Sequence, residues 1–263
     1  MPDFDHREVT THYDQLLAPL YAWMLGDLGD ARRTAKLELE RLGVTRCSSP
    51  KRALDLGAGL GLHAVPLAEL GYEVTAIDTS PELLAELRQA RPDVNTLTGD
   101  LTLAPQLTRG PFDVIVCLGD TLTHLESRAA VQAAIGGARQ LLAPGGLLLL
   151  TWRDYSQARS GASRFFLVRG DAQRILTCCL GYEAERVEVT DIVHERRGDG
   201  WQMHASAYHK LRLSLPEVEA MLSAAGLSLA QSEHASGWLR LSAADTRPAD
   251  TRPADTPATN TLA

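Results

Sequence analysis

The sequence predicts an α/β fold: a mostly parallel seven-stranded sheet with helices on both faces, and an antiparallel β subdomain inserted after the fifth strand. Three observations lead to it. Between about residues 51 and 152, continuous apolar runs alternate with helical segments, as in a sheet buried on both faces. Between about 160 and 212, polar and apolar residues alternate, as in antiparallel hairpins. Two further strand-like runs, the last ending at about residue 241, then return to the sheet.

The first 45 residues are expected to be helical. From Tyr13 to Met24 the large apolar residues recur at three- and four-residue spacing, and a second such stretch covers 28–42. This spacing favours packing of Tyr13 and Tyr21 on an apolar face. The segment therefore predicts a helical region that precedes the sheet.

The parallel part of the sheet is expected at residues 53–56, 73–77, 94–97, 112–117 and 147–152. Helices are expected between these runs at 62–70, 81–91 and 128–142, the last closed by a Pro-Gly-Gly sequence. Ser80 and Pro81 are typical of the cap and first turn of a helix. Each strand is thus followed by a helix that can cover one face of the sheet.

The inserted strands are expected at 164–168, 174–180, 186–194 and 202–211, followed by a helix at 215–225. The domain that contains both parts is expected to span 46–243. The last segment, 244–263, repeats the sequence Asp-Thr-Arg-Pro-Ala with no large apolar residue, so it is expected to be disordered.

Composition excludes several classes of protein. The net charge of −7 argues against electrostatic gripping of nucleic acid. No apolar run approaches the roughly 20 residues of a membrane helix, and the first residues lack the features of a signal peptide, so a cytoplasmic protein is expected. The four cysteines form no C-x-x-C pair, which predicts free thiols and no metal site. The sequence predicts no oligomeric state.

A glycine-rich loop follows the first strand. Asp55 ends that strand, and Gly57, Gly59 and Gly61 come next. Glycine allows unusual dihedral angles and lets a ligand approach the backbone closely. The G-x-G-x-G spacing differs from the G-x-G-x-x-G pattern that places a helix end against a pyrophosphate. The loop alone is a weak signal, since a structural turn would also explain it.

Carboxylates at the next two strand ends strengthen the interpretation. Asp78 ends the second strand, where it can accept both hydroxyls of a ribose, although capping of the next helix is an alternative. Asp100 follows the third strand, where it can accept an adenine amino group. Ligands of such sheets bind beyond the carboxyl ends of the strands. The pattern suits a ligand with an amino acid and a nucleoside but no phosphate.

Together these residues resemble the class I S-adenosylmethionine-dependent methyltransferases, whose sheet is Rossmann-like. The resemblance implies that the loop with Gly57, Ala58 and Gly59 binds the methionine part of S-adenosylmethionine. It also implies that Asp78 holds the ribose and that Asp100 and Leu101 meet the adenine. Because N-terminal helices often form lids in this family, residues 1–45 are expected to cover the cofactor. The expected cofactor contacts are Tyr13, Asp55, Gly57, Ala58, Gly59, Asp78, Thr79, Asp100, Leu101 and Cys117.

A narrower resemblance concerns the methyl acceptor. The segment 117–125 and the later Trp-Arg-Asp-Tyr at 152–155 look like the glycine and sarcosine N-methyltransferase branch. There an asparagine usually stands at the position of Asp120, and an arginine matching Arg153 clamps the substrate carboxylate. The departure to Asp120 puts a negative charge near the acceptor, which favours a cationic amine and puts glycine in doubt. His124 is a candidate general base, and a structural histidine is the alternative.

The expected activity is methyl transfer from S-adenosylmethionine to a small molecule, with N-methylation slightly favoured over O-methylation. The catalytic candidates are His124, Arg153 and Asp120. Two other classes remain open: a non-catalytic S-adenosylmethionine-binding sensor or partner subunit, and a nicotinamide-dependent oxidoreductase, which the glycine spacing disfavours. Neither a nucleic acid nor a membrane is expected as a partner.

Overall fold

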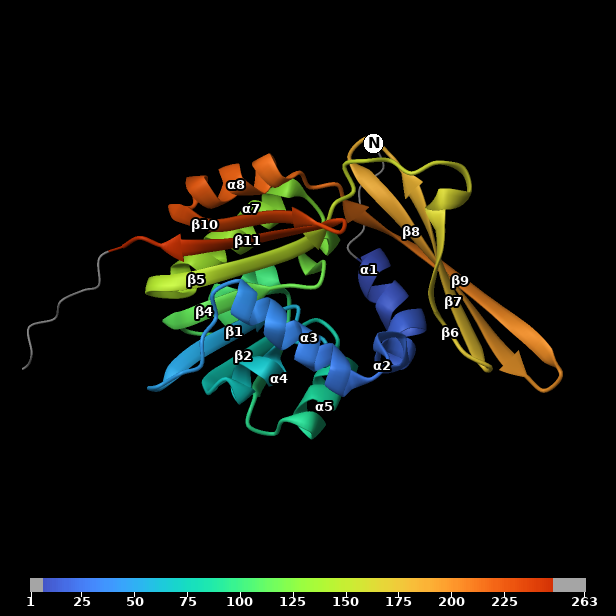
Figure 1. The fold of residues 1–263 in the computed structure, drawn as a ribbon, viewed down its shortest axis with the longest axis horizontal. Coiled ribbons are helices and arrows are strands. Elements are labelled where there is room, and N and C mark those ends of the chain that lie inside the picture. Colours follow the sequence, from blue (N-terminus) through green and yellow to red (C-terminus); the bar gives the residue numbers. More distant parts are fainter. Residues whose placement is uncertain (1–6, 248–263) are drawn as a thin grey trace, which may run out of the picture.

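The computed structural model describes residues 7–247 and contains two sheets with helices around and between them (Figure 1). The larger sheet has seven strands in the order β10-β11-β5-β4-β1-β2-β3. Its strands are β1 (Lys51–Leu56), β2 (Tyr72–Asp78), β3 (Asn95–Thr98), β4 (Phe112–Cys117), β5 (Leu142–Arg153), β10 (Leu227–Ala235) and β11 (Trp238–Asp245). β1 to β5 pair in parallel and β11 joins β5 antiparallel. The predicted fold class is confirmed.

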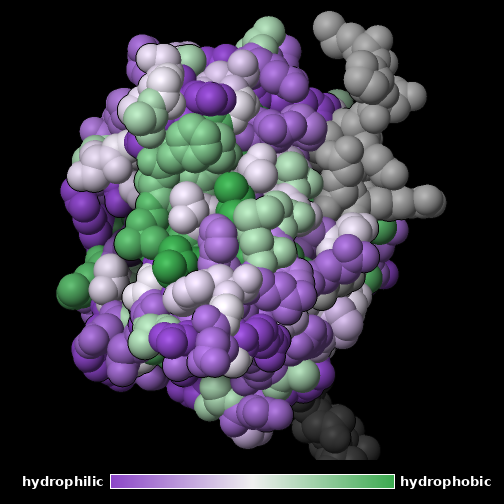
Figure 2. All heavy atoms as spheres, turned by 90° about the vertical axis from the view of Figure 1, so that its right-hand side faces the viewer, coloured by the Kyte–Doolittle hydropathy of each residue, from purple (hydrophilic) through white to green (hydrophobic). Residues whose placement is uncertain are grey.

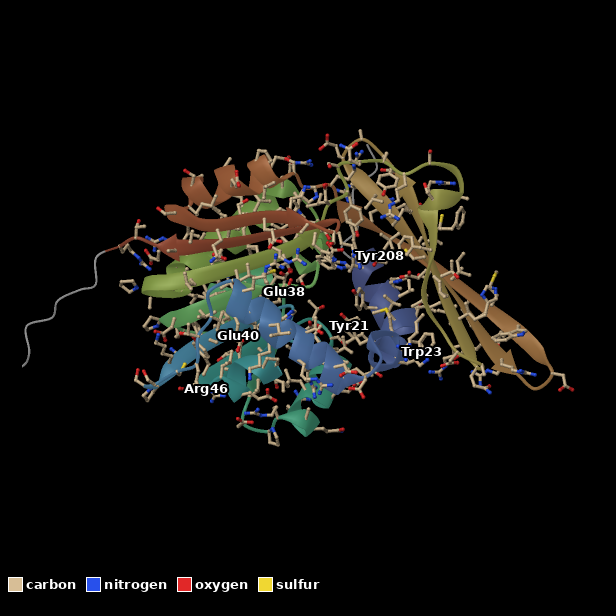
Figure 3. The ribbon with its side chains drawn as sticks, in the orientation of Figure 1. Tyr21, Trp23, Glu38, Glu40, Arg46 and Tyr208 are labelled. Atoms are coloured by element: carbon tan, nitrogen blue, oxygen red, sulfur yellow. The ribbon has the colours of Figure 1, made fainter. Side chains whose placement is uncertain are left out.

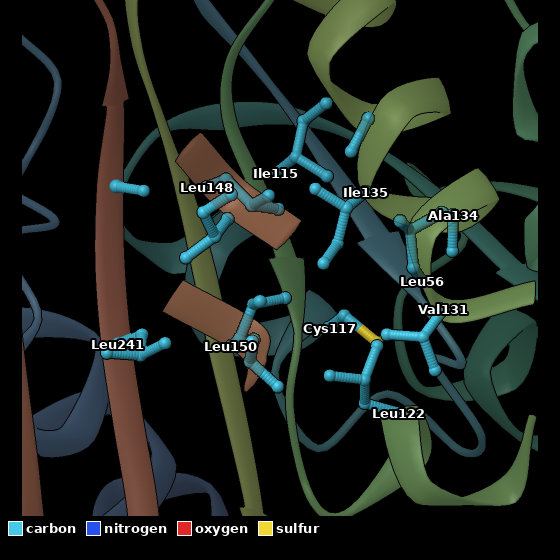
Figure 4. Packing of buried hydrophobic residues seen from close by; sticks show 14 of the residues in the cluster. Leu56, Ile115, Cys117, Leu122, Val131, Ala134, Ile135, Leu148, Leu150 and Leu241 are labelled. Carbon is cyan, nitrogen blue, oxygen red and sulfur yellow. The ribbon is translucent and has the colours of Figure 1, made fainter. Parts of the chain in front are cut away.

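Helices cover both faces of this sheet because neighbouring residues on each strand point to opposite faces. Leu54, Ile115 and Leu148 belong to one core, which includes α7 (Arg128–Leu141) and α8 (Leu215–Ala224) and is shown in part in Figure 4. Ala53 and Val114 belong to a second core. It includes residues of α3 (Leu28–Arg41), α4 (Ala64–Glu69) and α5 (Pro81–Ala90). Strands buried on both faces explain the continuous apolar runs of the sequence.

The strand order of the larger sheet reverses between β1 and β4. β1 lies between β4 and β2, so the connections after β1 and β4 lead to opposite halves of the sheet. A crevice at the carboxyl ends of the strands is the usual ligand site of such sheets. Short helical turns lie at these ends: η3 (Leu101–Leu103) and α6 (Ala104–Leu107) after β3, and η4 (Thr121–His124) after β4.

The inserted sheet is antiparallel and has the order β6-β7-β8-β9. Its strands are β6 (Phe165–Gly170), β7 (Arg174–Tyr182), β8 (Arg186–Arg197) and β9 (Gly200–Leu211), preceded by the turn η5 (Gly161–Arg164). The N-terminal helices α1 (Arg7–His12) and α2 (Tyr21–Leu25) lie between the two sheets (Figure 1). They are joined by a π-helical turn, η1 (Tyr13–Leu17), and a 3-10 turn, η2 (Ala18–Leu20).

The two faces of the inserted sheet differ in burial. Val187, Val189 and Tyr208 face inward and pack with Val9 of α1. The side of the molecule that carries this sheet shows a green apolar area among polar residues (Figure 2). Large exposed apolar side chains of its edge strands include Phe165, Leu167, Trp201 and Met203. The inner face thus anchors the N-terminal helices above the larger sheet.

Two boundaries differ from the sequence prediction. β5 begins at Leu142, five residues before the expected start, because Leu142 already pairs with Phe112 and a register shift precedes Val114. β11 continues to Asp245, so residue 243 is too early an end for the folded domain. Asp245 is buried and its carboxylate binds Arg139 of α7 at 3.0 Å, which fixes the first residue of the repeat to the core. The expected disordered tail otherwise lies outside the described residues.

Within residues 7–247, no helix has the length and apolar character needed to cross a membrane.

Candidate functional site

A cavity with about 850 Å³ of empty space, part of it open to solvent, lies at the carboxyl ends of the parallel strands. Its lining comes from segments far apart in sequence: Val9, Tyr13, Tyr21, Gly57, Gly59, Ile77, Asp78, Thr79, Ser80, Leu83, Gly99, Asp100, Leu101, Gly119, Thr121, His124 and Leu125. Parallel pairing of β1, β2, β3 and β4 brings their ends to one edge. The structure therefore brings Gly57, Gly59, Asp78 and Asp100 together at this edge.

The glycine loop forms the floor of this cavity. Gly57 has φ +77° and Gly59 has φ +52°, values that L-residues with side chains rarely adopt. A Cβ on Gly57 would lie 2.2 Å from Cγ2 of Thr121, so no side chain fits there. The backbone N–H groups of Gly57 and Ala58 both donate to the carbonyl of Ile77, at 2.8 and 3.0 Å. The loop is therefore a fixed, bare backbone surface that a ligand can approach closely.

Asp78 holds the loop as well as facing the cavity. Its carboxylate accepts the N–H of Gly59 at 2.7 Å and the N–H of Ser80 at 2.8 Å. Burial raises the pKa of Asp78, and these two hydrogen bonds oppose the rise. Ser80, not Asp78, caps helix α5, since its hydroxyl accepts the N–H of Leu83 at 3.3 Å. The helix-cap alternative for Asp78 is therefore wrong, and its carboxylate is left to serve the loop and the cavity.

Asp100 and Leu101 line the adjacent part of the cavity, beside Gly99. Asp100 caps the turn η3, because one carboxylate oxygen accepts both the N–H and the hydroxyl of Thr102, at 2.8 and 2.7 Å. This cap fixes the side chain at the end of β3. Asp78 and Asp100 thus lie at the ends of two adjacent strands and line the same cavity.

The N-terminal helices contribute two tyrosines. Tyr13 and Tyr21 line the cavity, with ring centroids 6.1 Å apart. Figure 3 shows Tyr21 approaching from the N-terminal helices, and Tyr208 from the four-stranded sheet. Burial, with the charge of Asp78 adding to it, raises the pKa of Tyr21 to about 12, so its phenol stays protonated and neutral. Tyr13 thus both packs against apolar neighbours and lines the cavity, the two roles considered for it from the sequence.

His124 lies in an aromatic cluster at the cavity wall. Its ring stacks on Tyr208 with centroids 5.5 Å apart and planes 8° apart, and Tyr13 meets it edge-on at 5.6 Å. His12 packs on the Tyr208 ring at 4.3 Å and binds Asp191 of β8 through Nε2 at 3.0 Å. Aromatic neighbours restrict the imidazole to one orientation beside Thr121 and Leu125.

Asp120 is buried beneath this cluster and has a different environment from the one expected. Its Oδ2 accepts Nζ of Lys210 at 2.6 Å and the hydroxyl of Tyr155 at 3.0 Å. Its Oδ1 accepts the Thr123 hydroxyl at 2.9 Å and the Arg153 N–H at 3.0 Å. Burial alone would raise the pKa of Asp120, but the Lys210 charge holds it below its usual value. The negative charge expected at Asp120 is thus paired with Lys210, a compensation that the sequence analysis did not foresee.

Two predicted site residues lie elsewhere. Arg153 is exposed, and its guanidinium lies over the ring of Trp238 at 4.5 Å rather than in the cavity. The structure does not bring Arg153 to the cavity lining, so a carboxylate clamp by Arg153 finds no support in this arrangement. Cys117 is buried in the core below the loops, where burial raises its thiol pKa, so it does not contact a ligand in the cavity.

Asp55, at the end of β1, and Ala58, within the loop, do not line the cavity. Burial raises the pKa of Asp55 to about 6, and the charge of nearby His63 lowers it in part. Its Oδ2 has no hydrogen-bond partner among the described residues.

The sequence analysis did not identify Thr121 and Leu83, which line the cavity, or Lys210, which lies beside it. Lys210 is a lone lysine in an alternating strand, and only the packing of β9 against the turn η4 brings it to Asp120.

The residues present fit S-adenosylmethionine. The loop leaves no room for a side chain at Gly57, as close approach of a ligand requires. Asp78 and Asp100 offer acceptors at separate strand ends, and tyrosine rings close the other side. None of the cavity-lining residues described is a lysine or arginine, the side chains that most often pair with a phosphate group.

The sequence family described as "Methyltransferase domain" matches residues 53–146, the segment that carries every one of these strand ends. Residues 53–146 therefore form a methyltransferase domain. The match, the strand order and the glycine loop support the S-adenosylmethionine-dependent class I type.

Curated relatives match about half of the chain or less. Human glycine N-methyltransferase is 30% identical over 152 residues, which are 51% of this chain and 51% of the human protein. Glycine/sarcosine N-methyltransferase of Parasynechococcus marenigrum is 32% identical over 117 residues, 43% of this chain and 42% of the relative. The chain thus spans about half the length of these relatives, or less.

Solved methyltransferases share the whole fold. The CcbJ methyltransferase of Streptomyces caelestis superposes with a TM-score of 0.68 at 22% identity, covering 94% of this chain and 100% of that one. CalS10, an amino pentose methyltransferase of Micromonospora echinaspora with bound S-adenosylmethionine, gives a TM-score of 0.65 at 21% identity, covering 92% and 98%. The coverage shows that the inserted sheet belongs to the shared fold.

Replacing Asp78 by alanine is expected to weaken S-adenosylmethionine binding about 10- to 100-fold. The change removes charged hydrogen bonds, each worth about 1.5–3 kcal/mol, from ligand and loop alike. Isothermal titration calorimetry measures the change, with Asp93→Ala as the control, since Asp93 pairs only with Arg91 at the surface. Equal affinities of the Asp78 variant and the unchanged protein would mean that the ribose site is misassigned.

Proposed function

We propose that this methyltransferase domain transfers the methyl group of S-adenosylmethionine to the nitrogen of a small-molecule amine. The observation that carries the proposal is the position of His124. It is the one basic side chain among the described cavity-lining residues, and it lies beside Gly119 and Thr121, next to the glycine loop. A neutral imidazole there can accept a proton from an acceptor amine.

The cavity also restricts the kind of acceptor. Arg153 does not reach it, so the described lining offers no permanent cation to hold a carboxylate. Val9, Leu125 and the ring of Tyr13 make the acceptor side largely apolar. These features favour an amine without a carboxylate over glycine. Amino sugars are one such class, and CalS10 is described as an amino pentose methyltransferase.

The chain's residues would act mainly by alignment. When bound, S-adenosylmethionine supplies an electrophilic methyl group. The glycine loop and Asp78 hold the methyl donor at the strand ends, while Tyr13 and Tyr21 exclude water from above. Orientation of two reactants in this way can lower a barrier by roughly 7–11 kcal/mol. His124 holds the proton that leaves the acceptor nitrogen.

The test is incubation of the purified chain with methyl-labelled S-adenosylmethionine and, separately, glycine, sarcosine and a free amino sugar. We expect label in the amino sugar at a higher rate than in glycine, and mass spectrometry of the product to place it on nitrogen. Label on oxygen would contradict the N-acceptor assignment. S-Adenosylmethionine binding without transfer to any acceptor would favour the alternative, a non-catalytic sensor or partner subunit.

His124→Gln is expected to lower kcat about 100-fold at pH 7, the lower range for loss of a general base. The loss should shrink toward pH 10, because a free amine then needs no base to lose its proton. A pH profile of kcat with the same amino sugar measures this, and His204→Gln, on the exposed part of β9, is the control. A loss that stays constant from pH 7 to 10 would assign His124 a structural role.

A further inference from the structure

Lys210 is a buried lysine of β9, and its side chain lies beside the end of β4. Only 8% of the residue is exposed. Its Nζ donates to Oδ2 of Asp120 at 2.6 Å and lies 5.6 Å from the centre of the Tyr208 ring. Removing such a charge from water is costly unless a partner of opposite sign compensates it. The pair therefore forms a fixed electrostatic contact between the inserted sheet and the cofactor-binding domain.

Asp120 is the residue that starts the turn carrying His124. It has φ +77°, a strained value for a residue with a side chain, and it directly precedes η4, whose last residue is His124. The Asp120 carbonyl accepts the Thr123 N–H at 3.2 Å and the Thr123 hydroxyl at 2.8 Å. The carboxylate and the imidazole thus lie on one short turn, where the carboxylate attracts the imidazole in its protonated form.

Such a carboxylate would by itself keep His124 protonated, because a nearby negative charge stabilises the imidazolium. Two of the described rings that pack against His124 carry no charge. Tyr13 and Tyr208 are neutral, since burial raises the pKa of both phenols well above the usual value. On the far side of Tyr208, Asp191 is paired with His12.

We propose that Lys210 is the residue that keeps His124 available as a base, by cancelling the charge of Asp120. This inference rests on the proposed function, in which His124 accepts the proton. It also explains how the turn tolerates a buried aspartate: the lysine of β9 compensates its charge. Lys210 is a positioning residue, because it acts on His124 through Asp120 and lines no part of the cavity.

The test follows the His124 imidazole itself, so it needs no acceptor. Carbon-13-labelled histidine is incorporated into the full chain, the His124 signal is assigned by its loss in His124→Gln, and its titration is followed by NMR. Lys210→Met is expected to raise the midpoint by about one pH unit or more, since a repelling charge is lost. Asp120→Asn is expected to lower it, and the double variant should return it close to the original value.

Lys210→Gln serves if the methionine variant fails to fold, because an amide can still donate to Asp120 while carrying no charge. Lys36→Met, on helix α3, is the control and should leave the midpoint unchanged. A His124 midpoint that stays the same in Lys210→Gln or Lys210→Met overturns the proposal. A midpoint that shifts as expected in a chain that methylates no amine would support this charge effect and contradict the proposed function instead.

Discussion

Replacing Gly57 by valine is expected to abolish S-adenosylmethionine binding, with at least a 100-fold loss of affinity. Gly57 has φ +77°, which a β-branched residue adopts only with strain of order 1–3 kcal/mol. The new Cβ would also lie 2.2 Å from Cγ2 and 2.8 Å from Oγ1 of Thr121. Thr121 cannot yield easily, because its hydroxyl donates to the carbonyl of Leu118 at 2.9 Å. The loop must therefore move out of the position that leaves its backbone open to the ligand.

Gly145→Val separates this effect from backbone strain alone. Gly145 has nearly the same dihedral angle, φ +76°, but a Cβ there meets nothing within 4 Å and the residue lies at the start of β5, away from the cavity. We expect Gly145→Val to lose a little stability from the same backbone strain as Gly57→Val, and to keep its affinity for S-adenosylmethionine. Calorimetric titration with S-adenosylmethionine compares the two variants. Near-normal affinity in Gly57→Val, with the fold intact, would mean that the ligand does not approach this loop.

The fold could be predicted from the sequence because each strand has a local pattern of apolar residues. Continuous apolar runs mark strands such as β4 and β5, which are buried on both faces, and alternation marks β8, where Val187 and Val189 face inward while Glu188 does not. Boundaries were less readable. Pro144 and Gly145 are typical helix terminators, yet they lie within β5 because pairing of Leu142 with Phe112 overrides that signal.

The cofactor half of the site was also predictable, since each of its residues follows a recognisable strand. Gly57, Asp78 and Asp100 need only the parallel order of the sheet to come together. The acceptor half depends on contacts between segments about 90 residues apart, such as Lys210 with Asp120. Sequence spacing cannot show on which side of β5 the Arg153 side chain lies, and the structure turns it toward Trp238.

Trp152→Ala is expected to destabilise the folded protein by about 3–5 kcal/mol, the usual cost of truncating a large buried aromatic residue. Trp152 is fully buried, and its indole N–H donates to the carbonyl of Leu213 at 3.0 Å. The change would leave both a cavity and an unpaired buried carbonyl between β5 and the segment that leads to α8. Chemical denaturation monitored by circular dichroism measures the loss. Trp201→Ala is the control, because Trp201 is 49% exposed and its removal should cost little.

The same substitution should also affect the site, because Trp152 follows directly on Thr151. The Thr151 hydroxyl accepts the Gly119 N–H at 3.0 Å, and its carbonyl accepts the Asp120 N–H at 3.2 Å. A loosened β5 end would therefore release the turn that carries His124, while Asp78 and the glycine loop, held by β2, stay in place. We expect the stability loss to be accompanied by a lower kcat and a nearly unchanged affinity for S-adenosylmethionine. Equal losses in both measurements would mean that the core and the whole site are coupled as one unit.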